Sequence, residues 1–251
     1  MLNNIDWRGM LFLDVETVPQ QPDYSGLDDL RRELWDKKMR STSEREGKTP
    51  EELYDRAGIY AEFGKIVCIS AAYFADGTFN EKSFYGHDER KLLEEFSSFL
   101  SKPKSDANSE FFITSMCAHN GKEFDYPYIA RRCLINSLPI PPLLDNAGKK
   151  PWEVNLIDTM ELWKFGDYKS YTSLELLVTC FGIPTPKDKM EGKDVWKVYW
   201  IENNVEKIKE YCEKDVRAVA GLFLKFKYPD KQITIDQILS NNKTDKGENQ
   251  Q

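Results

Sequence analysis

The chain has 251 residues, of which 40% are hydrophobic and 31% are charged, and its formal net charge is −7. These values are typical of one soluble domain, and they argue against a membrane-spanning protein and against broad, charge-driven coating of duplex DNA. Five cysteines without a C-x-x-C pair predict reduced, buried thiols, and two histidines leave little scope for a zinc site. The N-terminus shows no secretory signal, so we expect a cytoplasmic protein without membrane contact.

Three strands are predicted in the first third of the chain, at residues 10–15, 65–74 and 78–85. Asp76 and Gly77 stand between the second and third strands, and an Asp-Gly pair is typical of a tight hairpin turn. We therefore expect the second and third strands to pair with each other.

Residues 19–64 form a long insertion between the first two strands. The segment is rich in charged residues and turn formers, and it shows helical periodicity at residues 27–39 and 51–63. A connection of this length is usually functional or disordered. Two interpretations are open: a partly helical flap beside a functional site, or a purely structural addition.

Alternating helices and strands are predicted after the hairpin. A helix is expected at residues 88–100 with Asp88 as its N-cap, followed by a strand at 111–118, a helix at 124–136 and a strand at 153–158. This order indicates an α/β fold in which helices pack on a mixed sheet.

The last part of the chain is predicted to be helical. Thr172 and Glu175 match a capping box at one helix start, and Gly182 stands where that helix should stop. Asn203 and Glu206 make a similar start for the last long helix. We expect one domain over residues 1–228, with the insertion at 19–64, and a tail at 229–251 that is largely disordered from about residue 240.

Four carboxylates occupy positions where apolar residues are expected. Asp14 and Glu16 alternate with Leu and Val in the first strand, so both point to one face, and Asp215 lies within the apolar stripe of the last helix. Two carboxylates about 5 Å apart repel by roughly 3 kcal/mol at an effective dielectric of 20, so a cluster with Asp125 requires a cation. Oxygen ligands without His or Cys nearby favour Mg²⁺ or Mn²⁺, and four acids can hold two ions.

The same residues resemble the DEDD superfamily of 3′-5′ exonucleases, in its tyrosine subclass. Any one of the three motifs is weak alone, but they occur together in the expected order and on the expected elements. The motifs are D-x-E at Asp14 and Glu16, N followed by F-D at Asn120, Phe124 and Asp125, and Y-x-x-x-D at Tyr211 and Asp215. Further similarity over about residues 8–228 points to stand-alone relatives of the proofreading domain of family B DNA polymerases.

The resemblance implies a ribonuclease-H-like fold: a five-stranded mixed sheet, three strands antiparallel and two parallel, with helices on both faces. It also implies two-metal hydrolysis at a nucleic acid 3′ end, releasing nucleoside 5′-monophosphates. In this interpretation Asp14 bridges two Mg²⁺ or Mn²⁺ ions, Glu16 and Asp215 hold one of them, and Asp125 serves the other. Tyr211 orients the attacking water.

Three more residues match substrate-contacting positions of the family. The resemblance implies that Thr17 contacts the terminal nucleotide, and that Asn120 and Phe124 line the path of the strand. Simpler roles are open for some residues: Asp125 could cap its helix, Asn120 could hold a turn with Gly121, and Asp158 is better explained as a helix cap. Buried salt bridges are the simpler alternative for Asp14 and Asp215.

Three functions are open at this point. The sequence favours an exonuclease that acts on single-stranded or frayed DNA 3′ ends. The first alternative is a 3′-5′ exoribonuclease, because the 2′-hydroxyl preference cannot be read from these motifs. The second is a catalytically inactive nucleic-acid-binding domain, although the full set of acids and Tyr211 argues against it.

Overall fold

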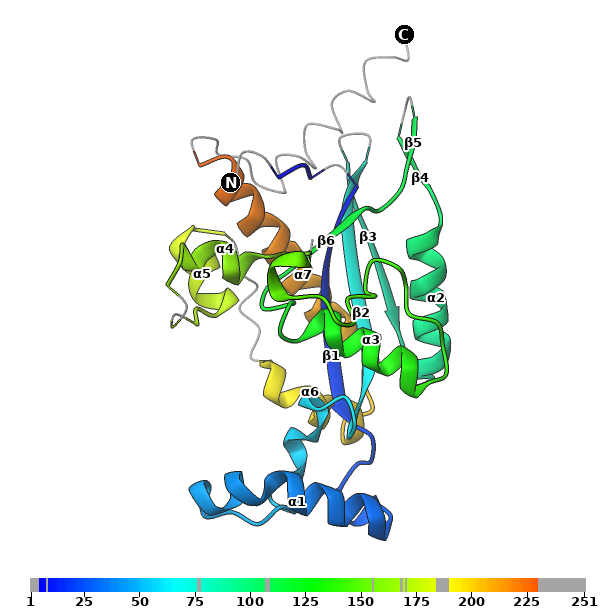
Figure 1. Cartoon of the computed structure of the whole chain (residues 1–251), viewed down its shortest axis with the longest axis vertical. Helices are drawn as coiled ribbons and strands as arrows, with labels where there is room; N and C mark the ends of the chain where they lie inside the picture. The colour runs from blue at the N-terminus through cyan, green and yellow to red at the C-terminus, as the bar shows by residue number, and fades with distance from the viewer. Residues whose placement is uncertain are drawn as a thin grey trace.

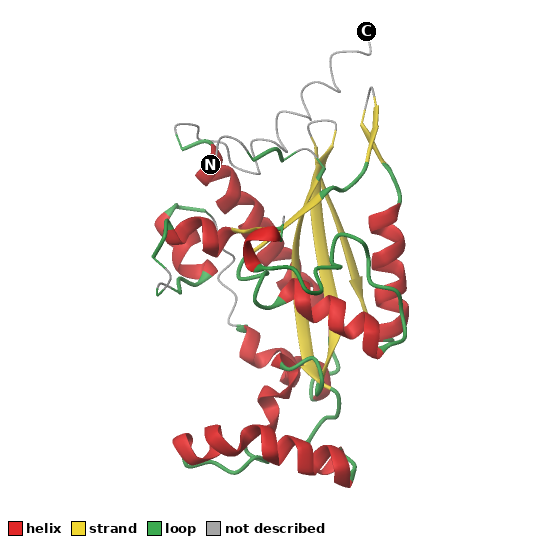
Figure 2. Cartoon of the chain, viewed as in Figure 1, coloured by secondary structure: helices red, strands yellow, loops and turns green. Residues whose placement is uncertain are grey.

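The computed structural model describes residues 5–7, 9–75, 78–106, 109–154, 156–167, 169, 171–183 and 190–229. Its centre is a five-stranded sheet in the order β3-β2-β1-β6-β7 (Figures 1 and 2). The strands are β1 (Met10–Pro19), β2 (Gly64–Ala75), β3 (Thr78–Tyr85), β6 (Ser115–Ala118) and β7 (Ile157–Asp158).

The sheet has the predicted mixture of directions. β1 pairs antiparallel with β2, and β2 pairs antiparallel with β3, whereas β6 and β7 run parallel to β1. Two predicted strands are much shorter than expected. In the predicted strand at 111–118, Ile113 lies outside any strand and is apolar because it is buried, not because it pairs in the sheet. At the start of the predicted strand at 153–158, Pro151–Glu153 forms a 3-10 helix instead.

The residues just before β6 belong to a different small sheet. β4 (Lys104–Asp106) and β5 (Ser109–Phe111) pair with each other as an antiparallel two-stranded ribbon. The predicted strand at 111–118 therefore contains the end of one strand, a connection and a second strand. Periodicity alone does not separate these, because it does not identify the pairing partner.

Helices cover both faces of the main sheet, as predicted. One face packs against α2 (Glu89–Ser101) and α3 (Asp125–Ile135), through Leu11 and Leu13 of β1. The other face packs against α7 (Val205–Lys227), through Met10 and Phe12. Because alternate residues of β1 face opposite helix layers, Asp14 and Glu16 project on the α7 side.

The structure confirms two of the predicted helix ends and shifts two others by one residue. Asp88 caps α2, where its Oδ1 accepts a hydrogen bond of 3.0 Å from the Lys91 amide, and Gly182 follows α5 (Leu174–Cys180) with φ of +63°. The caps of α5 and α7 lie one residue later than predicted, at Ser173 and Asn204. Asn203 has φ of +48°, whereas an N-cap residue is normally extended.

The insertion folds around its own apolar cluster and lies at one end of the molecule (Figure 1). It contains η2 (Tyr24–Gly26), α1 (Asp29–Glu46) and the 3-10 helix η3 (Tyr54–Ile59). α1 extends beyond the predicted range because its apolar side chains end at Met39 while the exposed helix continues to the left-handed Gly47. Trp35 is fully buried in this cluster and donates a hydrogen bond to the Pro50 carbonyl.

Some predictions lie outside the described residues, namely the Asp76-Gly77 turn and the tail from residue 230 onward. All five cysteines are free thiols, and four are buried, but Cys180 is exposed, contrary to the expectation. Within the described ranges, no helix combines the length and apolar character needed to cross a membrane.

Candidate active site

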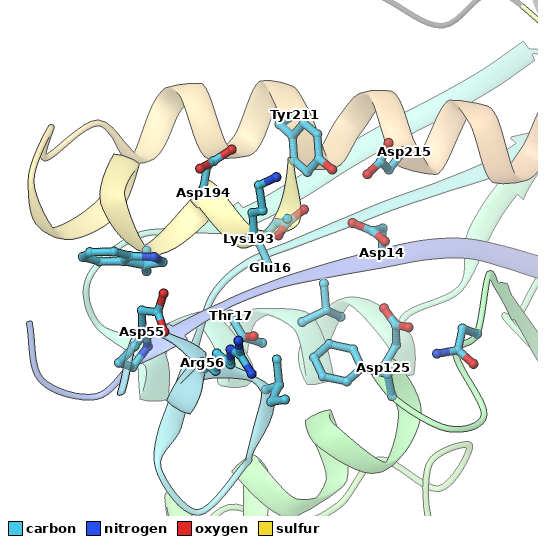
Figure 3. A pocket seen from close by; sticks show the side chains of 18 of the residues that line it. Asp14, Glu16, Thr17, Asp55, Arg56, Asp125, Lys193, Asp194, Tyr211 and Asp215 are labelled. Carbon is cyan, nitrogen blue, oxygen red and sulfur yellow. The ribbon is translucent and has the colours of Figure 1, made fainter. Parts of the chain in front are cut away.

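A cleft of about 700 Å³ opens between β1, α3 and α7. Its walls contain all eight residues that the sequence singled out: Asp14, Glu16, Thr17, Asn120, Phe124, Asp125, Tyr211 and Asp215. Figure 3 shows Tyr211 and Asp215 on one side, Asp125 on the other, and Asp14 between them. The structure thus brings the predicted residues together, and their chemical roles stay predictions.

Three elements bring the four acids to this cleft. β1 supplies Asp14 and Glu16, whose side chains share one face of the strand. The pairing of β1 with β2 is irregular immediately after Glu16, where Glu16 lies opposite Cys68 but Thr17 lies opposite Ile66. Asp125 is the first residue of α3, and Asp215 is one turn beyond Tyr211 in α7.

Burial raises the pKa of every acid in the cluster, and repulsion by other members of the cluster raises the pKa of Asp14 and Glu16 further. The pKa of Asp14 is raised by burial and then by the charges of Asp215 and Asp125, and that of Glu16 by burial and then by Asp14. Burial raises the pKa of Asp125 to about 7 and that of Asp215 to about 6. The cluster therefore holds protons far more strongly than isolated carboxylates do.

The chemistry of the cluster fits divalent cations. Among the residues that the structure describes, no Lys or Arg forms an ion pair with Asp14, Glu16 or Asp125. Within that part of the chain, nothing supports the alternative of a buried salt bridge for Asp14. Carboxylate oxygens that repel one another in a cleft are suitable ligands for Mg²⁺ or Mn²⁺.

A thiol lies closer to this cluster than the sequence suggested. Ligand atoms of Asp14, Glu16 and Cys212 lie within 4.8 Å of one another. The Cys212 thiol donates to the Asp14 carbonyl at 3.3 Å and to its Oδ2 at 3.4 Å. Burial raises the pKa of Cys212, so the thiol stays neutral and acts as a hydrogen-bond donor behind Asp14. The sequence could have indicated that Cys212 lies near the acids, because Cys212 is three residues from Asp215 on the same helix.

Tyr211 is hydrogen-bonded to Asp215. Burial raises the pKa of the Tyr211 phenol, and the charges of Asp215 and Glu16 raise it further. The phenol therefore stays protonated at neutral pH and can donate a hydrogen bond, but it is a poor proton acceptor.

The loop before α3 is held by Asp158, which does more than cap a helix. Its Oδ1 accepts from the Met160 amide at 2.9 Å, which makes it the N-cap of α4 (Thr159–Lys164) as predicted. The same carboxylate also accepts from the amides of Asn120 at 2.9 Å and Lys122 at 3.1 Å. Asn120 has φ of +61°, so the loop needs this support to keep an unfavourable backbone conformation.

His119 also lines the cleft, although we expected no role for it from the sequence. Its Nδ1 lies 2.9 Å from the Thr159 hydroxyl, and its Nε2 lies 2.9 Å from the Thr172 carbonyl. Both ring nitrogens are thus engaged, and burial lowers the pKa of the imidazole. This arrangement makes His119 a support of the loop.

Thr17 and Phe124, which both line the cleft, contact the same tyrosine. The Thr17 side chain is hydrogen-bonded to Tyr128, and the Phe124 ring lies 5.2 Å from the Tyr128 ring. Tyr128 is almost fully buried, so both residues rest on a rigid base.

Two further walls line the cleft, and the sequence left the first of them open as one of two interpretations of the insertion. One comes from the insertion and contains Asp55, Arg56 and Ile59. The other comes from η5 (Gly192–Asp194) and α6 (Val195–Trp200), and contains Lys193 and Trp196. Neither wall carries a recognisable motif, because its position depends on how distant elements pack.

Comparison with solved structures defines the class of fold. A family B DNA polymerase from the hyperthermophilic archaeon Pyrobaculum calidifontis matches with a TM-score of 0.50 and 14% identity, over 91% of this chain and 26% of the polymerase chain. E. coli Exonuclease I in complex with a 5cy-dA13 oligonucleotide matches with a TM-score of 0.40 and 11% identity, over 94% of this chain and 42% of that chain. The match to the polymerase chain shows a ribonuclease-H-like fold of the kind found in exonuclease domains. The chain spans less than half of either protein.

The family follows from the sequence match. The chain belongs to the family of predicted 3′-5′ exonucleases related to the exonuclease domain of PolB, whose model matches residues 59–246. The match includes Asp125, Tyr211 and Asp215, while β1 and most of the insertion precede it. A search of curated proteins found no match.

Proposed function

We propose that this protein is a metal-dependent exonuclease of the tyrosine subclass, which shortens DNA from single-stranded or frayed 3′ ends and releases nucleoside 5′-monophosphates. One observation carries the proposal: carboxylates from β1, α3 and α7 line a single cleft, in a chain of an exonuclease family. Repelling carboxylates are costly to a fold unless a cation offsets them.

Asp14, Glu16, Asp125 and Asp215 would hold two divalent ions, Mg²⁺ or Mn²⁺, which when bound activate water and stabilise charge at the attacked phosphate. Asp14 lies between Asp125 and Asp215 and is best placed to be shared. Tyr211 donates a hydrogen bond to Asp215, so its oxygen can accept a hydrogen bond from the attacking water and orient it.

The remaining cleft residues would hold the strand. Thr17, on its rigid base, would contact the terminal nucleotide, and Asn120 and Phe124 would line the path of the preceding ones. Aromatic rings provide sequence-tolerant stacking surfaces for unpaired bases. DNA is the favoured substrate because the family is related to a polymerase exonuclease domain, and RNA is the alternative.

Labelled strands test the proposal directly. DNA and RNA of one sequence, each labelled at the 5′ end, are incubated with Mg²⁺, Mn²⁺ or a chelator. We expect a ladder that shortens from the 3′ end of DNA with metal, and we expect its loss with chelator or with Asp14→Ala. Glu95→Ala is a matched control, because Glu95 is an exposed acid of α2 on the opposite side of the sheet.

Each other outcome has a definite meaning. Shortening of RNA alone would make the protein an exoribonuclease. Strand binding without shortening, unchanged in the Asp14→Ala variant, would indicate an inactive binding domain. Full activity in the folded Asp14→Ala variant would contradict the proposed site.

A further inference from the structure

We propose that the insertion forms a phosphate-binding wall of the cleft and that Arg56 is its contact to the nucleic acid strand. The inference rests on the proposed function and adds a substrate-binding residue to it. Arg56 lies before the first residue of the family match, so the family assigns it no role. The ligand chemistry is a phosphate group, either a diester of the strand or a phosphate at its 3′ end.

The position of Arg56 is the first support. Figure 3 shows Asp55, Arg56, Lys193 and Asp194 at one end of the cleft, and Asp14, Asp125 and Asp215 at the other. Gly58 and Ile59, from the same turn as Arg56, also line the cleft. If the reacting phosphate of a nucleic acid strand lies at the acids, another part of that strand can therefore contact this wall.

Rigid docking is the second support, because a wall can bind only if it keeps its place. The Tyr128 hydroxyl donates to the Gly58 carbonyl at 2.6 Å. A Cβ on Gly58 would lie 3.0 Å from Val18 backbone atoms and 3.2 Å from the Thr17 carbonyl, so a larger residue would force η3 and β1 apart by a few tenths of an ångström. Arg56 is thus two residues from Gly58, which contacts both Tyr128 and β1.

The orientation of the guanidinium is the third support. Arg56 Nη1 donates to Glu46 Oε1 at 2.9 Å, and Nη2 lies 2.9 Å from Oε2. This fork uses two of the five N–H donors of the side chain, so the other three are directed elsewhere. The side chain is 42% exposed, which leaves them accessible to a ligand. A pre-oriented arginine loses less conformational entropy when it binds a phosphate.

Charge is the fourth support. The catalytic end of the cleft carries four carboxylates, which repel the phosphates of a strand wherever bound ions do not offset them. Among the residues that line the other end, the cations Arg56, Lys193 and Lys197 outnumber the acids Asp55 and Asp194. Glu46 and Glu191, which are not among the lining residues, pair with Arg56 and Lys193, so a strand phosphate would compete with these two carboxylates for the cations. This end nevertheless lacks the four clustered carboxylates that repel a phosphate.

The test measures strand binding as a function of salt. Fluorescence anisotropy with labelled single-stranded DNA compares the parent with Arg56→Ala and Arg56→Lys, all with Mg²⁺ and all carrying Asp215→Asn so that the strand stays intact. Loss of one phosphate contact lowers the slope of log K against log salt by about 0.7, and weakens binding about fivefold at 0.1 M salt. We expect this loss in Arg56→Ala, and recovery of the slope in Arg56→Lys.

Arg40→Ala is the matched control, because Arg40 is an exposed arginine of α1 that does not line the cleft. It should bind as the parent does. Oligonucleotides with a 3′-hydroxyl and with a 3′-phosphate separate the two phosphate sources. An equal loss on both identifies a strand diester, and a larger loss on the 3′-phosphate identifies the terminal group.

Two results would overturn the inference while leaving the proposed function intact. One is an Arg56→Ala variant with the affinity and salt slope of the parent. The other is an equal loss in Arg40→Ala, which would reduce the effect to general charge. A parent protein that binds no single strand would refute the proposed function and the inference together.

Discussion

At the scale of single residues, Tyr211 shows how the site controls a side chain through its neighbours. An isolated phenol could exchange its proton near pH 10, but burial, and then the charges of the acids around Tyr211, raise its pKa further. Its contribution must then come from its hydrogen bond to Asp215 and from the orientation of water.

Tyr211→Phe tests this role. The variant loses the hydrogen bond but keeps the ring, so we expect kcat to fall about tenfold or more, as for one lost bond of roughly 1.4 kcal/mol. The alkaline side of the pH-rate profile should keep its shape, because the phenol does not titrate in that range. A profile that loses an ionisation in Tyr211→Phe would show that the phenol acts as a base.

At the scale of elements, the loop before α3 depends on one carboxylate from a neighbouring strand. Asp158→Ala removes acceptors from the amides of Asn120 and Lys122 and from the N-cap of α4. We expect a loss of about 3 kcal/mol or more in unfolding free energy, measured by urea denaturation. The Mg²⁺ concentration for half-maximal activity should also rise, since the loop positions Asp125. Asp158→Asn keeps one acceptor oxygen and should lie between the two proteins.

The contact between η3 and β1 gives a second prediction at this scale. Gly58→Ala places a methyl group against the Val18 and Thr17 backbones, so we expect a destabilisation of about 1–3 kcal/mol and weaker strand binding. Thermal unfolding and the anisotropy assay measure the two effects. Gly192→Ala is the control for stability, because a Cβ there meets nothing within 4 Å. An unchanged stability in Gly58→Ala would show that η3 is not tightly docked.

These elements also show what a sequence can predict. Alternation in β1 identified the face of Asp14 and Glu16, because the two sides of a buried strand must match two helix layers. Spacing in α7 placed Tyr211 beside Asp215 for a similar reason. The position of Arg56 in the cleft could not be predicted, because it depends on a close approach between η3 and β1. The only sign of this approach in the local sequence is the presence of glycines. The predicted ends of the strands were wrong because apolar residues are also buried in the connections between strands, as Ile113 is.

At the scale of the whole molecule, the acid cluster works against the stability of the metal-free fold. The pKa of Asp125 is raised from 3.8 to about 7, and that of Asp215 from 3.8 to about 6. The folded state therefore binds more protons than the unfolded chain, and this contribution, complete below pH 3.8, is lost as pH rises through about 6 and 7. Divalent ions should restore stability above that range.

Thermal unfolding at pH 5 and pH 8 checks this dependence. At 100 times the dissociation constant, Mg²⁺ or Mn²⁺ should stabilise the fold by about 2.7 kcal/mol, which raises Tm by roughly 5–10 °C at pH 8 and by less at pH 5. Asp125→Asn should raise the metal-free Tm at pH 8 and reduce the response to metal. A wild-type protein whose Tm at pH 8 does not change when metal is added would refute this link between metal binding and stability.

The most direct test of the whole interpretation is crystallographic. Anomalous diffraction from crystals containing Mn²⁺ should show two peaks in the cleft, both in contact with Asp14 and together contacted by Glu16, Asp125 and Asp215, and Asp14→Asn crystals should lose at least one of them. A wild-type cleft with full access to Mn²⁺ and no anomalous peak at these carboxylates would contradict the claim that they share divalent ions.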